Sequence, residues 1–241
     1  MPRRSPFVLL HGGRHGGWCW RKLTPLLRAA GHDVYTPTLT GLGERSHLLD
    51  RSVGLGTHID DLVATFEYED ITDAILVGHS YGGFVTSGAM ERLADRVKFV
   101  VLLDGHLAKQ GESVLYLNGV AREAAMTQLA REHGDGWFVP PADASRYGVT
   151  DPDDIEWANA RMTAQPLKTY QDPIGPTDSM WRHPGLFIEC NPSSLEADLL
   201  KRTRQRSIDD PAFGYAVLNA SHNAMVTDPV AVAELLLRSA L

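Results

Sequence analysis

A serine between glycines, in the segment Val77-Gly78-His79-Ser80-Tyr81-Gly82-Gly83, has the residue types needed for nucleophilic catalysis. A sharp turn from a strand into a helix would expose the Ser80 hydroxyl and leave no room for side chains at positions 78 and 82. The same turn would place the backbone N–H of Tyr81 at a helix N-terminus, aimed at a developing oxyanion. The pattern predicts Ser80 as a nucleophile and Tyr81 as an oxyanion donor, with a purely structural glycine turn as the alternative.

A second glycine-rich stretch, residues 10–18, follows the first apolar run and reads Leu-His-Gly-Gly-Arg-His-Gly-Gly-Trp. Glycines let the backbone approach a substrate carbonyl, so the N–H of Gly13 is the candidate for the second oxyanion donor. His11 and His15 do not form a metal motif, because the intervening glycines disfavour a helix that would bring them to one face. We expect His11 to pack within the loop, whereas His15 either packs there or lines a substrate pocket.

A histidine near the C-terminus stands in Ala220-Ser221-His222-Asn223-Ala224, just after the last apolar run. From the carboxyl end of a strand, a histidine can reach the serine across the point where the strand order reverses. Position therefore favours His222 as the general base among the chain's ten histidines, with His183 as the less favoured alternative.

The acid that would orient this histidine is harder to place. It usually follows the penultimate strand, but the turn at residues 191–194 is Asn-Pro-Ser-Ser and holds no aspartate. Glu189 lies within or at the end of that strand, and Glu196 and Asp198 come later, where a helix begins. Asp104 directly follows another buried strand and precedes a glycine. We predict Asp104 as the acid, with Glu196 or Asp198 in reserve.

Short apolar runs alternate with helix-like stretches along the chain, which predicts a doubly wound α/β sheet, mostly parallel and of about six strands. A mixed α+β domain is the alternative. The expected strands are Phe7–Leu10, Val34–Tyr35, Ala74–Val77, Val97–Leu103, Leu186–Ile188 and Tyr215–Leu218. The expected helices are Trp20–Ala30, Thr57–Glu69, Gly83–Leu93 and Val230–Ser239.

One interval, residues 105–185, interrupts the alternation and shows no clear buried strand. Because so long a structureless loop is improbable in a compact domain, we expect a helical cap inserted into a single domain, 1–241. Its helical candidates are Val114–Glu132 and Asp154–Met162. Together with His15, Trp137 and Trp157 are predicted to bind substrate. Cap core is the alternative for both tryptophans and for the other large cap aromatics, Tyr116, Phe138 and Trp181.

Composition narrows the class of partner. A formal charge of −7 and a pI near 5.8 provide no basic field for nucleic acid or an anionic membrane, so a small molecule is the expected partner. The basic run at residues 201–206 is expected to be a solvated helix face. The start is too short for a signal-peptide core, and two cysteines suit a reducing compartment, so we expect a cytoplasmic location. No metal or cofactor motif is expected, and the oligomeric state stays open.

The sequence resembles the α/β-hydrolase superfamily, and more closely the branch that contains plant hydroxynitrile lyases, plant methyl esterases and small bacterial esterases. The resemblance covers nearly the whole chain. The motifs that carry it are Val8-Leu9-Leu10-His11-Gly12 with Gly16-Gly17-Trp18, Tyr35 to Arg45 (Tyr-Thr-Pro-Thr-Leu-Thr-Gly-Leu-Gly-Glu-Arg), Gly78-His79-Ser80-Tyr81-Gly82-Gly83 and Ser221-His222-Asn223-Ala224-Met225.

This resemblance implies Ser80 as nucleophile, His222 as base, and Gly13 and Tyr81 as oxyanion donors. Plant members of the branch carry the acid in the turn after the penultimate strand, whereas similar bacterial sequences place an aspartate where Asp104 stands.

Lyases of the branch have threonine after the first histidine and lysine after the catalytic one. Here Gly12 and Asn223 occupy those positions, and without the lysine charge that stabilises a departing cyanide, acyl transfer is favoured.

The expected function is therefore hydrolysis of a small carboxylic ester or carbamate through an acyl-serine intermediate. Two alternatives stay open. One is a lyase or polyketide-type cyclase that uses the same three residues, and the other is a ligand-binding member of the fold without catalysis.

Overall fold

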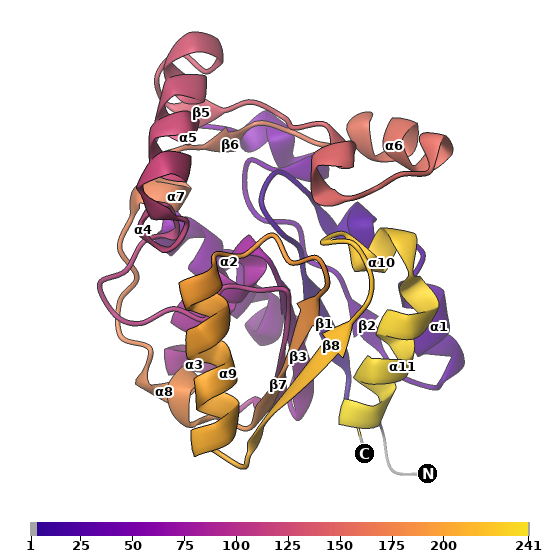
Figure 1. The fold of residues 1–241 in the computed structure, drawn as a ribbon. Coiled ribbons are helices and arrows are strands. Elements are labelled where there is room, and N and C mark those ends of the chain that lie inside the picture. The colour runs from indigo at the N-terminus through magenta and orange to yellow at the C-terminus, as the bar shows by residue number, and fades with distance from the viewer. Residues whose placement is uncertain (1–3, 241) are drawn as a thin grey trace.

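A computed structural model describes residues 4–240; residues 1–3, part of the basic start of the chain, and residue 241 lie outside the description. The centre is a six-stranded sheet in the order β2-β1-β3-β4-β7-β8, in which every pairing is parallel (Figure 1). The strands are β1 (Phe7–Leu10), β2 (Val34–Tyr35), β3 (Ala74–His79), β4 (Val97–Leu103), β7 (Gly185–Cys190) and β8 (Phe213–Leu218). All six coincide with predicted strands: β1, β2 and β4 have the predicted bounds, and β3, β7 and β8 extend one or two residues beyond them.

Helices cover both faces of this sheet, which explains why its strands are apolar runs without polar alternation. Val8 and Leu10 of β1 pack into one core, while Phe7 and Leu9 pack into the other. The first core lies beneath α2 (Leu55–Tyr68), α3 (Tyr81–Leu93) and α9 (Ala197–Asp209), and the second beneath α1 (Thr24–Ala29), α10 (Ala224–Thr227) and α11 (Pro229–Ser239) (Figure 1). Short 3₁₀ helices occur at η1 (Gly17–Trp20) and η2 (Gly43–Leu48), the second of which is kinked at Arg45.

The strand order reverses at β1, which pairs with β2 on one side and β3 on the other. The carboxyl ends of β1 and β3 lie side by side there, with Leu10 paired with Gly78. A crevice opens at the carboxyl ends of the strands at such a reversal, where parallel α/β sheets bind ligands. The loop after β1 and the turn after β3 therefore meet at the place where a site is expected.

Between β4 and β7 the chain forms a mostly helical excursion, part of which lies across the arrowhead end of the sheet (Figure 1). Its elements are α4 (Val114–Leu117), α5 (Gly119–His133), β5 (Phe138–Val139), η3 (Ala144–Tyr147), α6 (Pro152–Asn159), β6 (Gln165–Pro166), α7 (Lys168–Gln171) and α8 (Asp178–Arg182). The antiparallel β5–β6 pair was not predicted, because two residues per strand are too few to show an alternating pattern.

A glycine and a proline set the boundaries of two helices that the sequence predicted differently. The predicted helix Val114–Glu132 divides into α4 and α5 because Gly119 adopts a left-handed conformation, with φ +77°. The predicted helix Trp20–Ala30 is instead a 3₁₀ turn followed by α1, which has Pro25 in its first turn, a position that favours helix initiation.

The expectation of a fully solvated basic face at residues 201–206 is wrong for Arg206, which is only 5% exposed. Its guanidinium lies 3.7 Å from the centre of the Phe213 ring and donates to the carbonyls of Met180 and His183. Burial lowers the pKa of Arg206 to about 10. Consecutive side chains on a helix point in different directions around its axis, so a run of basic residues places some of them toward the core. No helix within residues 4–240 is long and apolar enough to cross a membrane.

Candidate active site

Ser80 occupies a strained turn between β3 and α3, with φ 51° and ψ −120°. Its carbonyl accepts hydrogen bonds from the backbone N–H groups of Gly83 (3.0 Å) and His106 (3.1 Å). A methyl group on Gly78 would lie 2.8 Å from the Cα of Gly83, and one on Gly82 would lie 2.6 Å from the His11 carbonyl oxygen. The two glycines are therefore required by the close packing of backbone around the serine.

Gly82→Ala is expected to lower the free energy of unfolding by about 1–3 kcal/mol, because its new methyl group would meet the backbone carbonyls of Leu10 and His11. Gly56 is the matched control, since it is also the second residue of its helix but has no atom within 4 Å of the added carbon. Gly56→Ala should be neutral or slightly stabilising. Urea unfolding of both variants checks this, and equal stability of the two would contradict the packing argument.

His222 and Asp104 form a buried pair, with 2.6 Å between Nδ1 and Oδ2. Asp104 directly follows β4 with φ 43°, and His222 lies in the loop after β8. An ionised carboxylate only accepts hydrogen bonds, so the Nδ1 of His222 carries the proton and its Nε2 is left able to accept one. That is the tautomer that a general base requires.

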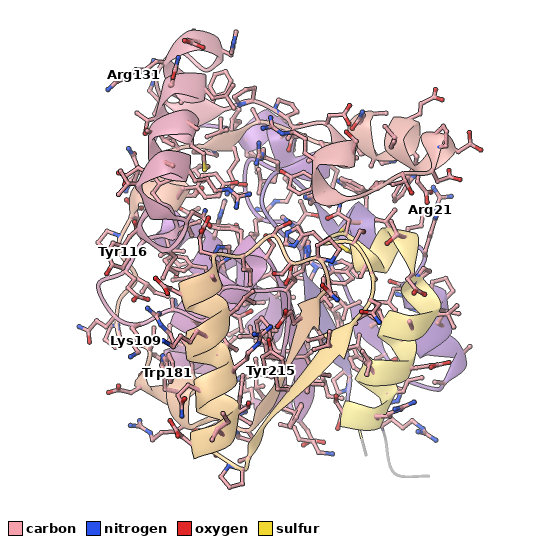
Figure 2. All side chains as sticks on the ribbon, viewed as in Figure 1. Arg21, Lys109, Tyr116, Arg131, Trp181 and Tyr215 are labelled. Atoms are coloured by element: carbon pink, nitrogen blue, oxygen red, sulfur yellow. The ribbon has the colours of Figure 1, made fainter. Side chains whose placement is uncertain are left out.

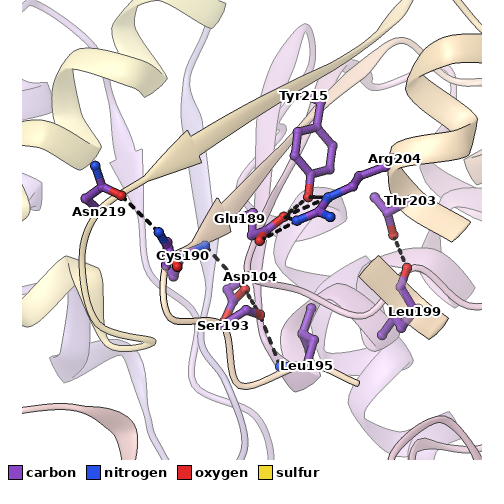
Figure 3. Close-up of polar contacts among 11 residues, drawn as sticks. Asp104, Glu189, Cys190, Ser193, Leu195, Leu199, Thr203, Arg204, Tyr215 and Asn219 are labelled. Atoms are coloured by element: carbon purple, nitrogen blue, oxygen red, sulfur yellow. Dashed lines mark hydrogen bonds and ion pairs between the residues drawn. The ribbon is translucent and has the colours of Figure 1, made fainter. Parts of the chain in front are cut away.

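The turn after β7 supports Asp104 instead of supplying the acid. Asp104 Oδ1 accepts from the Ser193 hydroxyl (2.6 Å) and the Cys190 N–H (3.4 Å) (Figure 3). Its Oδ2 accepts from the Ser194 N–H (3.3 Å). Hydrogen bonds to the charged form favour a buried carboxylate, which would otherwise be costly to desolvate. Sequence reasoning missed Ser193, although the Asn-Pro-Ser-Ser turn without an aspartate was the available signal.

The other candidate carboxylates have different surroundings. Glu189 pairs with Arg204 at 2.6 Å and also contacts the Tyr215 hydroxyl (Figure 3). Glu196 and Asp198 are exposed at the beginning of α9. The alternative base, His183, immediately precedes the amino end of β7, whereas Ser80 lies at the carboxyl end of β3. The geometry thus brings Asp104, and not the reserve residues, to His222.

Buried histidines hold the loops around Ser80. The Nε2–H of His79 donates to the backbone carbonyl of His222 (2.9 Å), and their rings lie 4.7 Å apart. His15 donates from Nδ1 to the Gly13 carbonyl (2.7 Å), while its Nε2 accepts from the Asn223 side chain (3.1 Å). Burial lowers the pKa of His15 to about 3 and that of His79 well below its usual value, so both rings are neutral at physiological pH.

His11 has the packing role predicted for it. Its Nδ1 donates to the Gly12 carbonyl (2.8 Å), and its Nε2 accepts from the Leu39 N–H (3.1 Å). Burial lowers the pKa of His11 to about 4. Within residues 4–240 no group of three or more His, Cys, Asp or Glu side chains is arranged to hold a metal ion.

The two oxyanion candidates, Gly13 and Tyr81, line the same cavity as the serine. The loop after β1 passes so close that a methyl group on Gly12 would lie 3.0 Å from the Cβ of Ser80, and Gly13 lines the same cavity as Ser80. Tyr81 is the first residue of α3, where a backbone N–H has no acceptor within the helix. The Tyr81 hydroxyl donates to Nδ1 of His58 (2.8 Å), whose Nε2 donates to a backbone carbonyl, so this residue is firmly anchored.

A cavity with about 560 Å³ of atom-free space, part of it open to solvent, lies above these groups. It is lined by Gly12, Gly13, Arg14, His15, His79, Ser80, Tyr81, His106, Val114, Asn118, Arg122, Met126, Tyr147, Tyr170, Ser194, Leu195 and His222. The lining therefore includes Ser80, His222, both oxyanion candidates and His15 from the predicted set.

The two tryptophans predicted to bind substrate are not in this lining. Trp157 packs edge-on against Trp18, with ring centres 5.2 Å apart, and Trp137 packs against Phe138 at 5.0 Å. Of the other cap aromatics, Tyr116 is mostly exposed on α4, and Trp181 lies beneath the Lys109 ammonium (Figure 2). These rings were predicted from type alone, and type does not say which way a cap residue faces.

Among the lining residues that the sequence analysis missed are Arg14, Arg122, Tyr147 and Tyr170. Arg14 stands inside the glycine-rich loop, and its position beside Gly13 was the available signal. Tyr147 stacks against His222, with ring centres 5.9 Å apart and planes at 29°. Tyr170 donates to Gln165 Oε1 (2.8 Å), which also accepts from the Arg14 N–H (2.7 Å). The tyrosines come from short cap segments whose sequence shows no helical or strand period.

The parallel sheet with a serine at the turn from β3 into α3 defines the α/β-hydrolase fold, as predicted. The chain belongs to the alpha/beta hydrolase family, whose model matches residues 7–235.

Relatives in this family include enzymes that act on esters. The chain is 39% identical over 175 residues to the carbendazim hydrolyzing esterase of Nocardioides sp. (strain SG-4G), covering 70% of this chain and 72% of that protein. It is 26% identical over 254 residues to methylesterase 10 of Arabidopsis thaliana, covering 95% and 90%. Among solved structures, an extracellular alpha/beta-hydrolase from a Paenibacillus species superposes with a TM-score of 0.84 at 20% identity, over 97% and 98% of the two chains.

Proposed function

We propose that this protein is a serine hydrolase that cleaves a small carboxylic ester or a related carbamate through an acyl-serine intermediate. The observation that carries the proposal is the buried Asp104–His222 pair, which opens onto the same cavity as Ser80 in its strained turn. The similarity to carbendazim hydrolyzing esterase and to methylesterase 10 supports ester or carbamate cleavage.

In the proposed reaction, Ser80 Oγ attacks the carbonyl carbon while His222 Nε2 takes its proton. The resulting oxyanion is held by the backbone N–H groups of Gly13 and Tyr81. His222 then returns the proton to the leaving alcohol, and the bond between the carbonyl carbon and the alkoxy oxygen breaks. Water attacks the acyl-serine by the same route, which gives a carboxylic acid and regenerates Ser80. Asp104 keeps the imidazole in the required tautomer and stabilises the imidazolium.

We further propose that residues 105–185 act as a cap within a single domain and set the substrate preference, because Asn118, Arg122, Tyr147 and Tyr170 of this segment line the cavity. The proposed compartment is the cytoplasm, supported by two buried cysteines that form no disulfide.

The alternative that keeps these residues as acid–base machinery, a lyase or cyclase, is less well supported. The position after His222, where lyases of the resembling branch carry lysine, is Asn223, whose neutral amide is buried and bonded to His15. A binding protein without catalysis would not need the Asp104–His222 pair beside a partly exposed serine.

The purified protein should hydrolyse p-nitrophenyl acetate, and a fluorophosphonate should label it with a single-adduct mass shift. It should not release benzaldehyde and cyanide from mandelonitrile above the spontaneous rate, because Asn223 supplies no charge to a departing cyanide. Cyanide release without ester hydrolysis would favour the lyase. The absence of both ester turnover and fluorophosphonate labelling would favour the binding protein.

A further inference from the structure

The cavity contains two arginines and no carboxylate. Arg14 lines it from the loop after β1, and Arg122 lines it from α5. No aspartate or glutamate is found among its lining residues, although the whole chain has a formal charge of −7. Asp104 lies behind His222 and outside this lining. The site is thus a positively charged pocket in an acidic protein.

Arg14 is held in place by its backbone, and its side chain hydrogen-bonds to Tyr147 and Tyr170 but leaves one donor, Nε, unused. Its N–H donates to Gln165 Oε1 (2.7 Å), in a left-handed conformation with φ 64°. Its guanidinium lies 5.8 Å from the centre of the Tyr147 ring. The buried Nε has no hydrogen-bond partner in the described part of the chain. A buried, unpaired donor on a cation is costly unless a ligand supplies an acceptor.

Arg122 is itself exposed at the rim of the cavity, and one of its terminal nitrogens donates to the Ser194 carbonyl (2.9 Å). Neither Arg122 nor Arg14 has a carboxylate within 4.0 Å in residues 4–240. Other arginines of the same chain do have one, as in the pairs Arg45–Asp61, Arg92–Asp60, Arg202–Glu112 and Arg204–Glu189.

The positive charge of the pocket comes from these arginines and not from His15, His79 or His106. Burial lowers the pKa values of His15, His79 and His106, so these rings are neutral near pH 7. Both guanidinium charges act on Tyr170, where they oppose the rise in the pKa of its hydroxyl that burial causes. An anion bound near Tyr170 would therefore feel both charges in a partly desolvated place, where electrostatic interactions are stronger than in water.

We propose that the natural substrate is an ester that also carries a carboxylate, which Arg14 and Arg122 bind while the ester carbonyl lies at Ser80. This inference rests on the proposed esterase function and names the substrate class of the same site. A guanidinium presents a planar set of donors that matches a carboxylate, and charged hydrogen bonds of this kind are stronger than neutral ones. The acidic remainder of the protein would disfavour adventitious anions elsewhere on the surface.

The test compares two matched pairs of esters at equal ionic strength. One pair carries the charge on the acid part: mono-p-nitrophenyl glutarate and its neutral terminal amide. The other carries it on the alcohol part: 4-acetoxybenzoate and 4-acetoxybenzamide. We expect the wild-type kcat/KM for the charged member of at least one pair to exceed that of its neutral partner by roughly tenfold or more. The preference should shrink at high salt.

Arg14→Gln should remove most of this preference, and Arg122→Gln should reduce it roughly fivefold because the group is more exposed. Arg131→Gln is the matched control: it lies on the same helix, near its other end and outside the cavity, and should leave the preference unchanged (Figure 2). The neutral esters serve as an internal reference for general damage to the site, and melting temperatures report on folding.

Equal or faster hydrolysis of the neutral member in both pairs would overturn the proposal, and so would a preference that survives in both Arg14→Gln and Arg122→Gln. Hydrolysis of the neutral esters that depends on Ser80 would then leave the esterase assignment standing. If none of the four esters is cleaved, and p-nitrophenyl acetate is not cleaved either, the esterase function fails and the substrate class falls with it.

Discussion

Ser80→Ala is expected to lower kcat for p-nitrophenyl acetate by on the order of 10⁶-fold, the scale found when the nucleophile of such a site is removed. Without the hydroxyl no acyl-enzyme forms, and His222 has no proton to take. The change should be nearly silent in stability, because the Ser80 side chain only partly leaves solvent and its backbone carbonyl keeps its bonds to Gly83 and His106. Steady-state kinetics and a thermal melt measure both effects.

The matched control for this variant is Ser87→Ala, a serine of the same helix whose hydroxyl donates only to the Gly83 carbonyl (2.8 Å). It should keep its activity and its fluorophosphonate adduct, whereas Ser80→Ala should lose both. If Ser80→Ala retained more than a few per cent of wild-type turnover and still formed the adduct, with contaminating esterase removed by a further purification step, the nucleophile would have been assigned to the wrong residue.

Asp104→Asn is expected to lower kcat by at least roughly 10²-fold and by up to about 10⁴-fold, with little change in KM. An amide keeps the shape of the side chain, but its NH₂ would face Nδ1 of His222, now 2.6 Å from Oδ2. The imidazole would then adopt the tautomer with the proton on Nε2, which cannot accept the proton of Ser80. Stabilisation of the imidazolium would be lost as well.

A structural effect could imitate this loss, because Asp104 is fully buried and also accepts from Ser193 and two backbone N–H groups. The melting temperature of each variant must therefore accompany its kinetics. Glu196→Gln and Asp198→Asn, on the exposed beginning of α9, serve as charge-matched controls and should be nearly silent. Wild-type turnover in Asp104→Asn, together with a large loss of kcat in a Glu196 or Asp198 variant that stays folded, would assign the acid to the beginning of α9.

Local sequence patterns were enough to predict the strands and the turn around Ser80. Buried parallel strands are apolar runs bounded by turn residues, and a strained turn requires glycine where backbone approaches within 3 Å, as at Gly78 and Gly82. The same local character allowed α2, α3 and α11 to be placed nearly to their ends. These features depend on residues that are close together in the chain, so they can be predicted from a single sequence.

Contacts between distant segments were decided by the tertiary structure. Asp104 and His222 are separated by 118 positions, and only the meeting of β4, β7 and β8 at one sheet edge favours Asp104 over Glu196 and Asp198. The Ser193 hydroxyl is likewise a partner of Asp104 only because β7 lies beside β4.

The sequence also could not predict which side chains of residues 105–185 point into the cavity. Trp137 and Trp157 were expected in the cavity, yet Tyr147, Tyr170 and Arg122 line it. Short irregular segments have no period that identifies an inward face, so their orientation is set by packing against the rest of the fold. The amino-acid sequence by itself predicted the fold class, and it proposed Ser80 as nucleophile and His222 as base, because each follows from a local pattern. Which carboxylate contacts His222 and which charges line the cavity depend on which distant residues meet, and only the packed structure decides that.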